Sequence, residues 1–349
     1  MKPALHAQYP SIADSTKEGT RNLLLSIPFE HLNHAFRLSV AESLYDGAKQ
    51  SSKQALVPSG IGNAWLPGYY RSFIFDPKQD RFLTDLLKLF RKIRKDQSLD
   101  SDRYLELMTA FVQTIPYDYQ KTASLDTAPR FPVETVVDGC GICSDKSLLL
   151  AAMLTKEGYS CAILHFGHDH HAAVGIPVPA GYDFAKCGYA VIETTAVSYI
   201  GGAPLAPDGP KQMRKPTVIP IGSGSRTYGA IRDLAKIHAV LAELSEKLKP
   251  EGTLASELTR LQKSIDQQTV TLRALKTELE SGTLPEEEDT VRRADAHARV
   301  LRLQQTIRQY NALANEFTDA QKLMAFMHVN RLDRTAVMTR LSAITPRKK

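Results

Sequence analysis

The spacing of apolar residues divides the chain into a first part of mixed pattern and a last part that is entirely helical. Between residues 76 and 115 the apolar side chains recur every three or four positions, which is the period of one helix face. Asp76-Pro77 and Asp100-Ser101 are start signals for two such helices, and Pro116 ends the second. We expect both apolar stripes to lie in the core.

The N-terminal region has a weaker pattern. We predict a helix over Leu32–Tyr45, and its expected buried face contains Phe36, Leu38, Val40 and Leu44. Prolines and glycines between residues 51 and 70 indicate an irregular segment. Residues 1–99 are therefore expected to form a helical and irregular segment that packs on the core.

The middle of the chain combines a helix with short strands. The apolar run Leu148–Leu154 follows a glycine- and cysteine-containing stretch and predicts a helix that ends at Gly158. Alternating or β-branched runs predict strands at residues 161–166, 171–176, 188–195 and 217–221. Because turns and loops join these strands, we expect an antiparallel sheet with the cysteine helix packed on it.

The last part of the chain has a heptad pattern. Its first arm places an apolar residue at alternating steps of four and three, with one polar position, at Leu254, Leu258, Leu261, Ile265, Gln268, Leu272, Leu275 and Leu279. Gly282 and Pro285 interrupt it, and a second arm continues to Met324 in the same rhythm. We predict an antiparallel coiled-coil hairpin, roughly 35–40 Å long. The alternative is a helical bundle packed back onto the first domain.

These patterns together predict an α+β protein of three parts. The expected divisions are the N-terminal segment 1–99, a core at 100–228 and an all-helical arm at 229–349. The arm has no chemistry of its own, and residues 254–324 are candidates for binding a protein partner or for self-association.

Composition narrows the function classes. The 349 residues are 43% hydrophobic and 23% charged, as expected of a globular protein. The net charge of +6 is small for this length, so it gives little reason to expect a nucleic-acid or membrane partner. No apolar run is long enough to span a bilayer, and the N-terminus lacks a signal-peptide core. We expect a cytoplasmic protein.

The four cysteines all lie between residues 140 and 187 and are too few for a disulfide scaffold. Cys140 and Cys143 form a C-x-x-C pair, which alone also suggests redox chemistry or half of a zinc site. Four nearby histidines between residues 165 and 171 could supply further zinc ligands, but they form no second regular pair. A redox motif would follow a strand in a βαβ unit, whereas this sheet is expected to be antiparallel.

A catalytic arrangement of cysteine, histidine and acid accounts for these cysteines and histidines better than a redox motif or a zinc site does. Cys143 precedes an apolar helix, where free N–H groups and the helix dipole favour a thiolate. His171 opens a strand and is the expected base, while Glu193 lies on a neighbouring strand, where an acid can orient the imidazole. Cys161 and Cys187 are expected to be buried hydrophobes. No metal or cofactor is expected.

The same residues resemble the transglutaminase-like (papain-like) superfamily of cysteine enzymes over about residues 100–225, in its bacterial and archaeal form. The matching segments are Gly141–Lys146 with the helix that follows, His171-Ala172, Tyr189–Thr195 and the earlier segment Phe111–Tyr117. The resemblance implies a cysteine helix against an antiparallel sheet and Cys–His–acid acyl transfer on amides. Gln113, just before the break at Pro116, is a candidate for oxyanion binding or support.

Two positions depart from the family pattern. The acid is Glu193 where the family usually has aspartate, and Ala172-Ala173 follow the histidine in place of a small residue and tryptophan. We expect a thioester at Cys143 with a protein or peptide amide, and hydrolysis, as in a protease or amidase, rather than crosslinking, because water needs no second site. The alternative is a catalytically silent scaffold that acts as a binding module through its helical arm.

Overall fold

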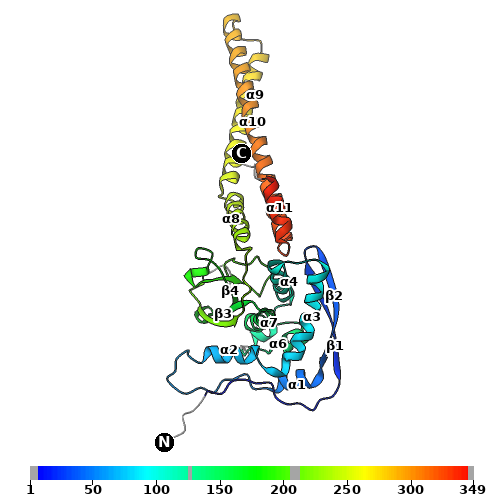
Figure 1. Ribbon diagram of the computed structural model, residues 1–349. Helices are drawn as coiled ribbons and strands as arrows, with labels where there is room; N and C mark the ends of the chain where they lie inside the picture. Colours follow the sequence, from blue (N-terminus) through cyan, green and yellow to red (C-terminus); the bar gives the residue numbers. More distant parts are fainter. Residues whose placement is uncertain (1–6, 125–127, 205–212, 345–349) are drawn as a thin grey trace. The chain divides into compact units, whose positions relative to one another are not determined.

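The computed structural model describes residues 7–124, 128–204 and 213–344, and these fall into two compact units. One unit consists of the described residues up to Lys236 together with those from Asn330 onward. The other spans Ile237–Val329. Figure 1 labels their helices and strands along the chain.

A four-stranded antiparallel sheet forms one layer of the first unit. Its strands are β3 (Ser160–Phe166), β4 (His171–Pro177), β5 (Tyr189–Ile192) and β6 (Thr217–Ser223), in the order β5-β4-β3-β6. Every neighbouring pair is antiparallel. The predicted mixture of helices with an antiparallel sheet is confirmed.

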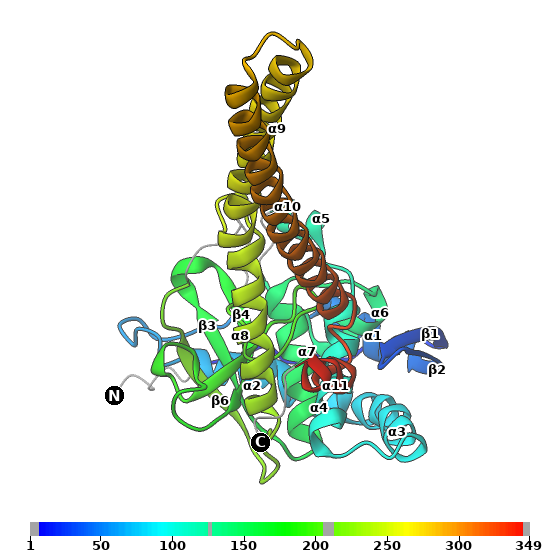
Figure 2. The same ribbon diagram turned by 90° about the horizontal axis from the view of Figure 1, so that it is seen from above.

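Helix α7 (Cys143–Lys156) is the centre of this unit. It contacts β3, β4 and β6 on one side and α3 and α4 on the other, as Figures 1 and 2 show. Every residue from Asp145 to Leu154 is buried, which fits a helix with neighbours all round. The helix ends before Gly158, whose φ of 79° is the left-handed conformation that glycine adopts readily.

The two amphipathic helices predicted before the cysteine are confirmed. Asp76 accepts a hydrogen bond from the Lys78 N–H at 2.9 Å, and a short 3-10 turn (Pro77–Gln79) leads into α3 (Asp80–Asp96). Asp100 accepts one from the Arg103 N–H at 2.8 Å and caps α4 (Ser101–Thr114). Phe90 and Phe111 pack edge to face between them, with ring centroids 5.3 Å apart.

The predicted helix over Leu32–Tyr45 is wrong. These residues form the second strand of a β-hairpin, β1 (Thr20–Phe29) with β2 (Leu32–Ala41), followed by α1 (Glu42–Gln50). Leu38 and Val40 are buried and their neighbours in the strand are exposed, which is the period of a strand.

Three further α-helices and two 3-10 turns lie in the described part of this unit, before the sheet or between its strands. The α-helices are α2 (Leu66–Ile74), α5 (Tyr119–Ala123) and α6 (Pro132–Asp138), and 3-10 turns occupy Gly167–Asp169 and Phe184–Lys186. Helix α1 contacts α6, and both α2 and α6 contact α7. The N-terminal residues therefore belong to the same core.

The second unit is built from long helices. It holds most of α8 (Ile231–Leu248), α9 (Thr253–Glu280) and α10 (Glu286–Val329). Helices α9 and α10 run side by side in opposite directions, since Gln268 donates to Thr306 at 3.1 Å and Glu278 pairs with Arg292 at 3.5 Å. Along α9, all eight predicted seam positions are buried or half-buried.

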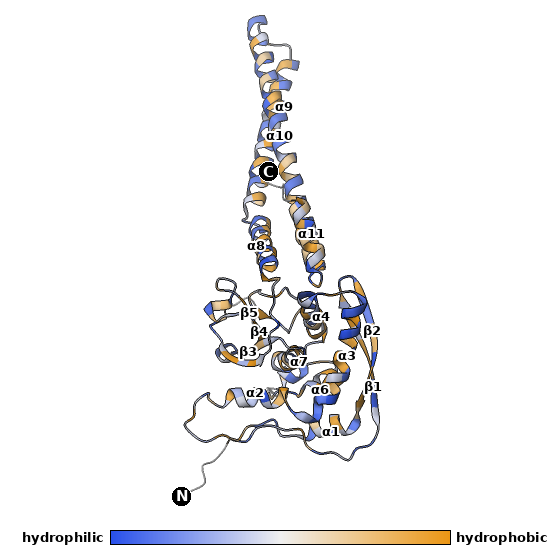
Figure 3. Cartoon of the chain, viewed as in Figure 1, coloured by the Kyte–Doolittle hydropathy of each residue, from blue (hydrophilic) through white to orange (hydrophobic). Residues whose placement is uncertain are grey.

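Polar and apolar residues are mixed along α9 and α10 (Figure 3). No helix among the described residues is long and apolar enough to cross a membrane.

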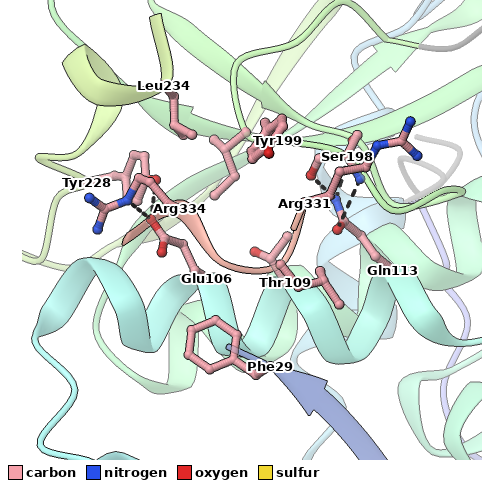
Figure 4. Close-up of a pocket in the computed structure, with 12 residues that line it drawn as sticks. Phe29, Glu106, Thr109, Gln113, Ser198, Tyr199, Tyr228, Leu234, Arg331 and Arg334 are labelled. Carbon is pink, nitrogen blue, oxygen red and sulfur yellow. Dashed lines mark hydrogen bonds and ion pairs between the residues drawn. The ribbon is translucent and has the colours of Figure 1, made fainter. Parts of the chain in front are cut away.

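The chain returns to the first unit with α11 (Arg334–Ile344). Figure 4 shows Arg334 beside Glu106 of α4 and Tyr228, at one side of a small cavity of about 30 Å³. The Glu106 carboxylate accepts from Arg334 Nε and from the Tyr228 hydroxyl, both at 2.6 Å. Burial raises the pKa of Glu106 to about 7, although Arg334 and Tyr228 act to lower it. Asp233 gives Arg334 a second acidic partner at 3.0 Å.

This pairing predicts a pH-dependent loss of stability in the Arg334→Ala variant. Without the guanidinium, an ionised Glu106 is left buried, which costs about 3 kcal/mol or more. Because its pKa is raised in the folded state, Glu106 is protonated and uncharged at pH 5, where loss of the guanidinium leaves no buried charge. At pH 8 ionisation is favoured, and the cost of the unpaired charge applies. Urea unfolding should therefore show a larger loss at pH 8 than at pH 5. Arg81→Ala, at a side chain that is 95% exposed, is the matched control and should change little at either pH. A loss of equal size at both pH values would contradict this role of Glu106.

Candidate active site

Cys143 is the first residue of α7 and is 8% exposed. The first N–H groups of a helix have no acceptor within it, so that of Cys143 is available to a ligand beside the sulfur. Gly141 allows the chain to enter the helix, because a Cβ there would lie 3.0 Å from Cβ of Asp145 and 3.1 Å from Cγ2 of Thr135. The thiol thus lies at the positive end of a buried helix, where a thiolate is favoured.

His171 and Glu193 form a buried pair. His171 is the first residue of β4, and Glu193 follows the last residue of β5, the neighbouring strand. His171 Nε2 lies 3.0 Å from Glu193 Oε2, and the two side chains are 1% and 3% exposed. The structure therefore brings together two of the three residues that the sequence singles out.

The other oxygen of Glu193 is held by the residues that follow it. Oε1 accepts from the backbone N–H groups of Thr194 at 2.8 Å and Thr195 at 2.9 Å, and from the Thr195 hydroxyl at 2.7 Å. Burial acts to raise the pKa of Glu193, but its bonds to His171 and Thr195 lower it to about 2. The carboxylate is therefore ionised at neutral pH and can only accept hydrogen bonds.

The ionised Glu193 determines which ring nitrogen of His171 faces it with a proton. An ionised Glu193 requires a proton on Nε2, so Nδ1 is the nitrogen left for the thiol. Nδ1 is buried and has no hydrogen-bond partner among the described residues. Cys143 nevertheless acts on this ring: burial would lower the pKa of His171, but its interactions with Cys143 and Glu193 raise it to about 9. An imidazolium beside the sulfur stabilises a thiolate.

Gln113 lies behind Glu193. Its side-chain amide nitrogen donates to the carbonyl oxygens of Glu193 at 2.8 Å and Ser198 at 3.0 Å. Because a primary amide has two N–H donors, both are engaged in holding this loop. The structure thus places Gln113 as a neighbour of the acid's backbone, and its donors are not directed to a bound oxyanion.

Lys146 is a buried residue that contacts the backbone of Gln113, and sequence reasoning missed it. Its ammonium donates to the carbonyl oxygens of Gln113 at 3.2 Å and Ile115 at 2.7 Å. Burial lowers its pKa to about 8, while the charge of Glu193 acts in the opposite direction. The available signal was a charged pair, Asp145-Lys146, at the start of a helix that is otherwise apolar.

Asp145 is the second missed group. Its carboxylate is fully buried and accepts from Lys121 Nζ at 3.0 Å to each oxygen, from the Arg130 N–H at 2.8 Å and from the Ile142 N–H at 3.1 Å. The first turn of α7 is therefore fastened to three positions that precede it in the chain. These contacts hold Cys143 in place.

The remaining cysteines are not bonded to one another. All four cysteines are free thiols. Cys140 donates to Asp118 Oδ2 at 3.5 Å, beside Arg130, which pairs with the same oxygen at 2.7 Å. Cys161 is buried, and Cys187 is partly buried against the sheet. Within residues 7–124, 128–204 and 213–344, no three His, Cys, Asp or Glu side chains gather as metal ligands would.

The comparison with protein families agrees with the predicted resemblance. Residues 88–184 match the model of a transglutaminase-like domain. This segment contains Cys143 and His171 but ends before Glu193. No curated protein and no solved structure matches the chain.

The position of Gln113 predicts that it supports the acid. In Gln113→Ala, loss of the two bonds should destabilise the fold by about 1–3 kcal/mol and slow the alkylation of Cys143 by iodoacetamide, because the Glu193 loop loosens. Gln113→Glu should do more damage, since a carboxylate would face two carbonyl oxygens. Alkylation forms no oxyanion, so it separates the two roles. If Gln113→Ala slowed amide hydrolysis and left the alkylation rate unchanged, Gln113 would be an oxyanion donor instead.

Proposed function

We propose that this protein is a cysteine hydrolase with a transglutaminase-like domain, which cleaves protein or peptide amides through a thioester at Cys143. The observation that carries the proposal is the buried His171–Glu193 pair, bonded through Nε2 at 3.0 Å, with the other ring nitrogen left for the thiol. Buried pairs of this kind also occur as purely structural ion pairs. Here, however, the pair interacts with a thiol at a helix N-terminus, which is the setting of an activated nucleophile.

The arrangement of Cys143, His171 and Glu193 supports acylation of the Cys143 thiol. The Cys143 thiolate attacks the carbonyl carbon of the amide, and the C=O bond opens to an oxyanion that the Cys143 N–H can bind. The tetrahedral intermediate collapses as His171 gives its proton to the leaving amine, so the C–N bond breaks and a thioester remains. Glu193 keeps the imidazole in the orientation that this transfer needs.

Deacylation uses the same groups in reverse. The neutral His171 takes a proton from water, whose oxygen attacks the thioester carbon. The C–S bond then breaks, releasing the carboxylic acid and returning the thiolate–imidazolium pair. We favour hydrolysis over crosslinking because water requires no second binding site, whereas an amine acceptor does.

The pair predicts how fast the thiol reacts. Because an imidazolium beside the sulfur stabilises a thiolate, and His171 keeps its proton up to about pH 9, Cys143 should react with iodoacetamide faster than the other cysteines at pH 7. In His171→Asn the thiol loses this partner. Its rate at pH 7 should fall about tenfold to thirtyfold. Mass spectrometry of tryptic peptides after timed labelling gives each cysteine its own rate.

Cys161 and Cys187 of the same molecules are internal controls, and their rates should not change in His171→Asn. Equal labelling rates at all four cysteines of the native protein would count heavily against the proposed enzyme.

A second function rests on the second unit. Helices α9 and α10 lie side by side, with buried leucines and the Gln268–Thr306 bond between them, which favours the predicted antiparallel coiled-coil hairpin. Val270 and Val291 are 66% and 65% exposed on this hairpin, so they are two apolar side chains there that a second copy of the chain could cover. In this reading the protein acts as a scaffold that self-associates through residues 254–324.

The scaffold reading predicts a dimer that depends on these valines. Light scattering of the full-length chain should give the dimer mass for the wild type and the monomer mass for the double variant Val270→Glu/Val291→Glu. The double variant Leu24→Glu/Leu56→Glu, at exposed residues of the first unit, should remain dimeric. A wild-type chain that is monomeric at all concentrations tested would rule out self-association through the hairpin.

A further inference from the structure

Tyr119 is an exposed aromatic residue in a segment that runs beside the entry to α7. Its side chain is 77% exposed although it lies at the start of the short helix α5 in the first unit. The ring packs edge to face on that of the half-buried Tyr117, with centroids 5.1 Å apart. An exposed tyrosine is common on its own, so its meaning depends on how firmly it is held and on what it lies beside.

The backbone of this segment is paired with the entry to α7. Tyr117 forms a parallel bridge with Gly141, two residues before Cys143. Gly141 donates to the Pro116 carbonyl at 3.1 Å and accepts from the Asp118 N–H at 3.3 Å. The chain that carries the two tyrosines therefore runs alongside the chain that leads to the thiol.

Side chains fasten the same segment to α7. Lys121, two residues after Tyr119, forms a buried ion pair with Asp145 of α7 at 3.0 Å. Asp118 accepts from the Lys121 N–H at 2.9 Å and pairs with Arg130 at 2.7 Å. The residues on either side of Tyr119 are thus fixed to the catalytic helix, while the ring itself faces solvent. A ring held in this way loses little conformational entropy when it binds a ligand.

The electrostatics agree with this position. Burial raises the pKa of Tyr117, and the negative charges of Cys143 and Asp145 raise it further. Burial and the charge of Cys143 also raise the pKa of Tyr70, from α2. Tyr117 and Tyr70 therefore both lie close enough to the sulfur to respond to its charge. Of these two, Tyr117 is the one that packs on an exposed ring, that of Tyr119.

We propose that Tyr117 and Tyr119 form a substrate subsite that binds an aromatic or flat apolar side chain next to the amide attacked by Cys143. The inference rests on the proposed function and adds a substrate class to it: peptides with such a side chain near the scissile bond. An edge-to-face or stacked contact with the Tyr119 ring would supply the affinity, and the fixed segment would supply the orientation.

Two electrophiles that differ in one ring test the subsite. 2-Chloroacetamide and N-benzyl-2-chloroacetamide both alkylate a thiolate with loss of chloride, but only the second carries an aromatic group. In the wild type the benzyl reagent should label Cys143 faster than the plain reagent does. Tyr119→Ala should lower this rate ratio about threefold to tenfold, the size expected for loss of one aromatic contact. Tyr119→Phe should keep the ratio, because the ring remains.

The controls separate failure of the subsite from failure of the proposed enzyme. Leu24→Ala, at a side chain that is 75% exposed in β1, should leave both rates unchanged. A ratio that is the same in Tyr119→Ala and wild type would overturn the subsite, as would an equal slowing by both reagents, which would show that Tyr119 only supports the fold. If plain chloroacetamide labelled Cys143 no faster than Cys187, the enzyme itself would be the part that fails.

Discussion

The first unit depends on the pairing of the charges that α7 carries into the core. Asp145 and Lys146 are fully buried, and a buried charge without a partner costs several kcal/mol, comparable with the whole stability of a domain. Each therefore requires partners from outside the helix. Asp145 finds Lys121, and Lys146 finds the carbonyl groups of Gln113 and Ile115. These partners all lie between residues 113 and 121, so that segment and α7 depend on each other for the pairing of their buried groups.

The same pairing sets the geometry of the candidate site. Lys146 holds the end of α4, where Pro116 leaves carbonyl groups free to accept. From that end the Gln113 side chain reaches the backbone of Glu193, whose carboxylate bonds His171. A continuous path of hydrogen bonds thus joins the helix that carries the thiol to the acid that orients the imidazole. A change in a residue that never contacts substrate, such as Gln113, can therefore alter the reactivity of Cys143.

The sequence predicted the elements whose signals are local. Asp76, Asp100 and Gly158 each mark a helix end by their own chemistry, and the structure has those ends. The hairpin was missed because Phe36, Leu38 and Val40 were assigned to a helix although they alternate with a period of two. Its turn has no glycine, yet Glu30 and His31 both adopt positive φ, 46° and 65°. The Lys121–Asp145 pair could not be predicted, since its members are 24 positions apart and meet only through tertiary packing.

Glu193 stands where the family that the sequence resembles usually has aspartate, and both of its carboxylate oxygens are held by fixed partners. Its side chain is one methylene longer than aspartate, and the added length lets Oε1 turn back to the Thr194 and Thr195 N–H groups while Oε2 reaches His171. The Thr195 hydroxyl adds a third bond to Oε1, so the longer side chain gains fixed partners that offset its additional rotamer freedom. The fold therefore has to hold an ionised carboxylate oxygen beside His171 Nε2. The loop that positions this oxygen matters more than whether the acid is aspartate or glutamate.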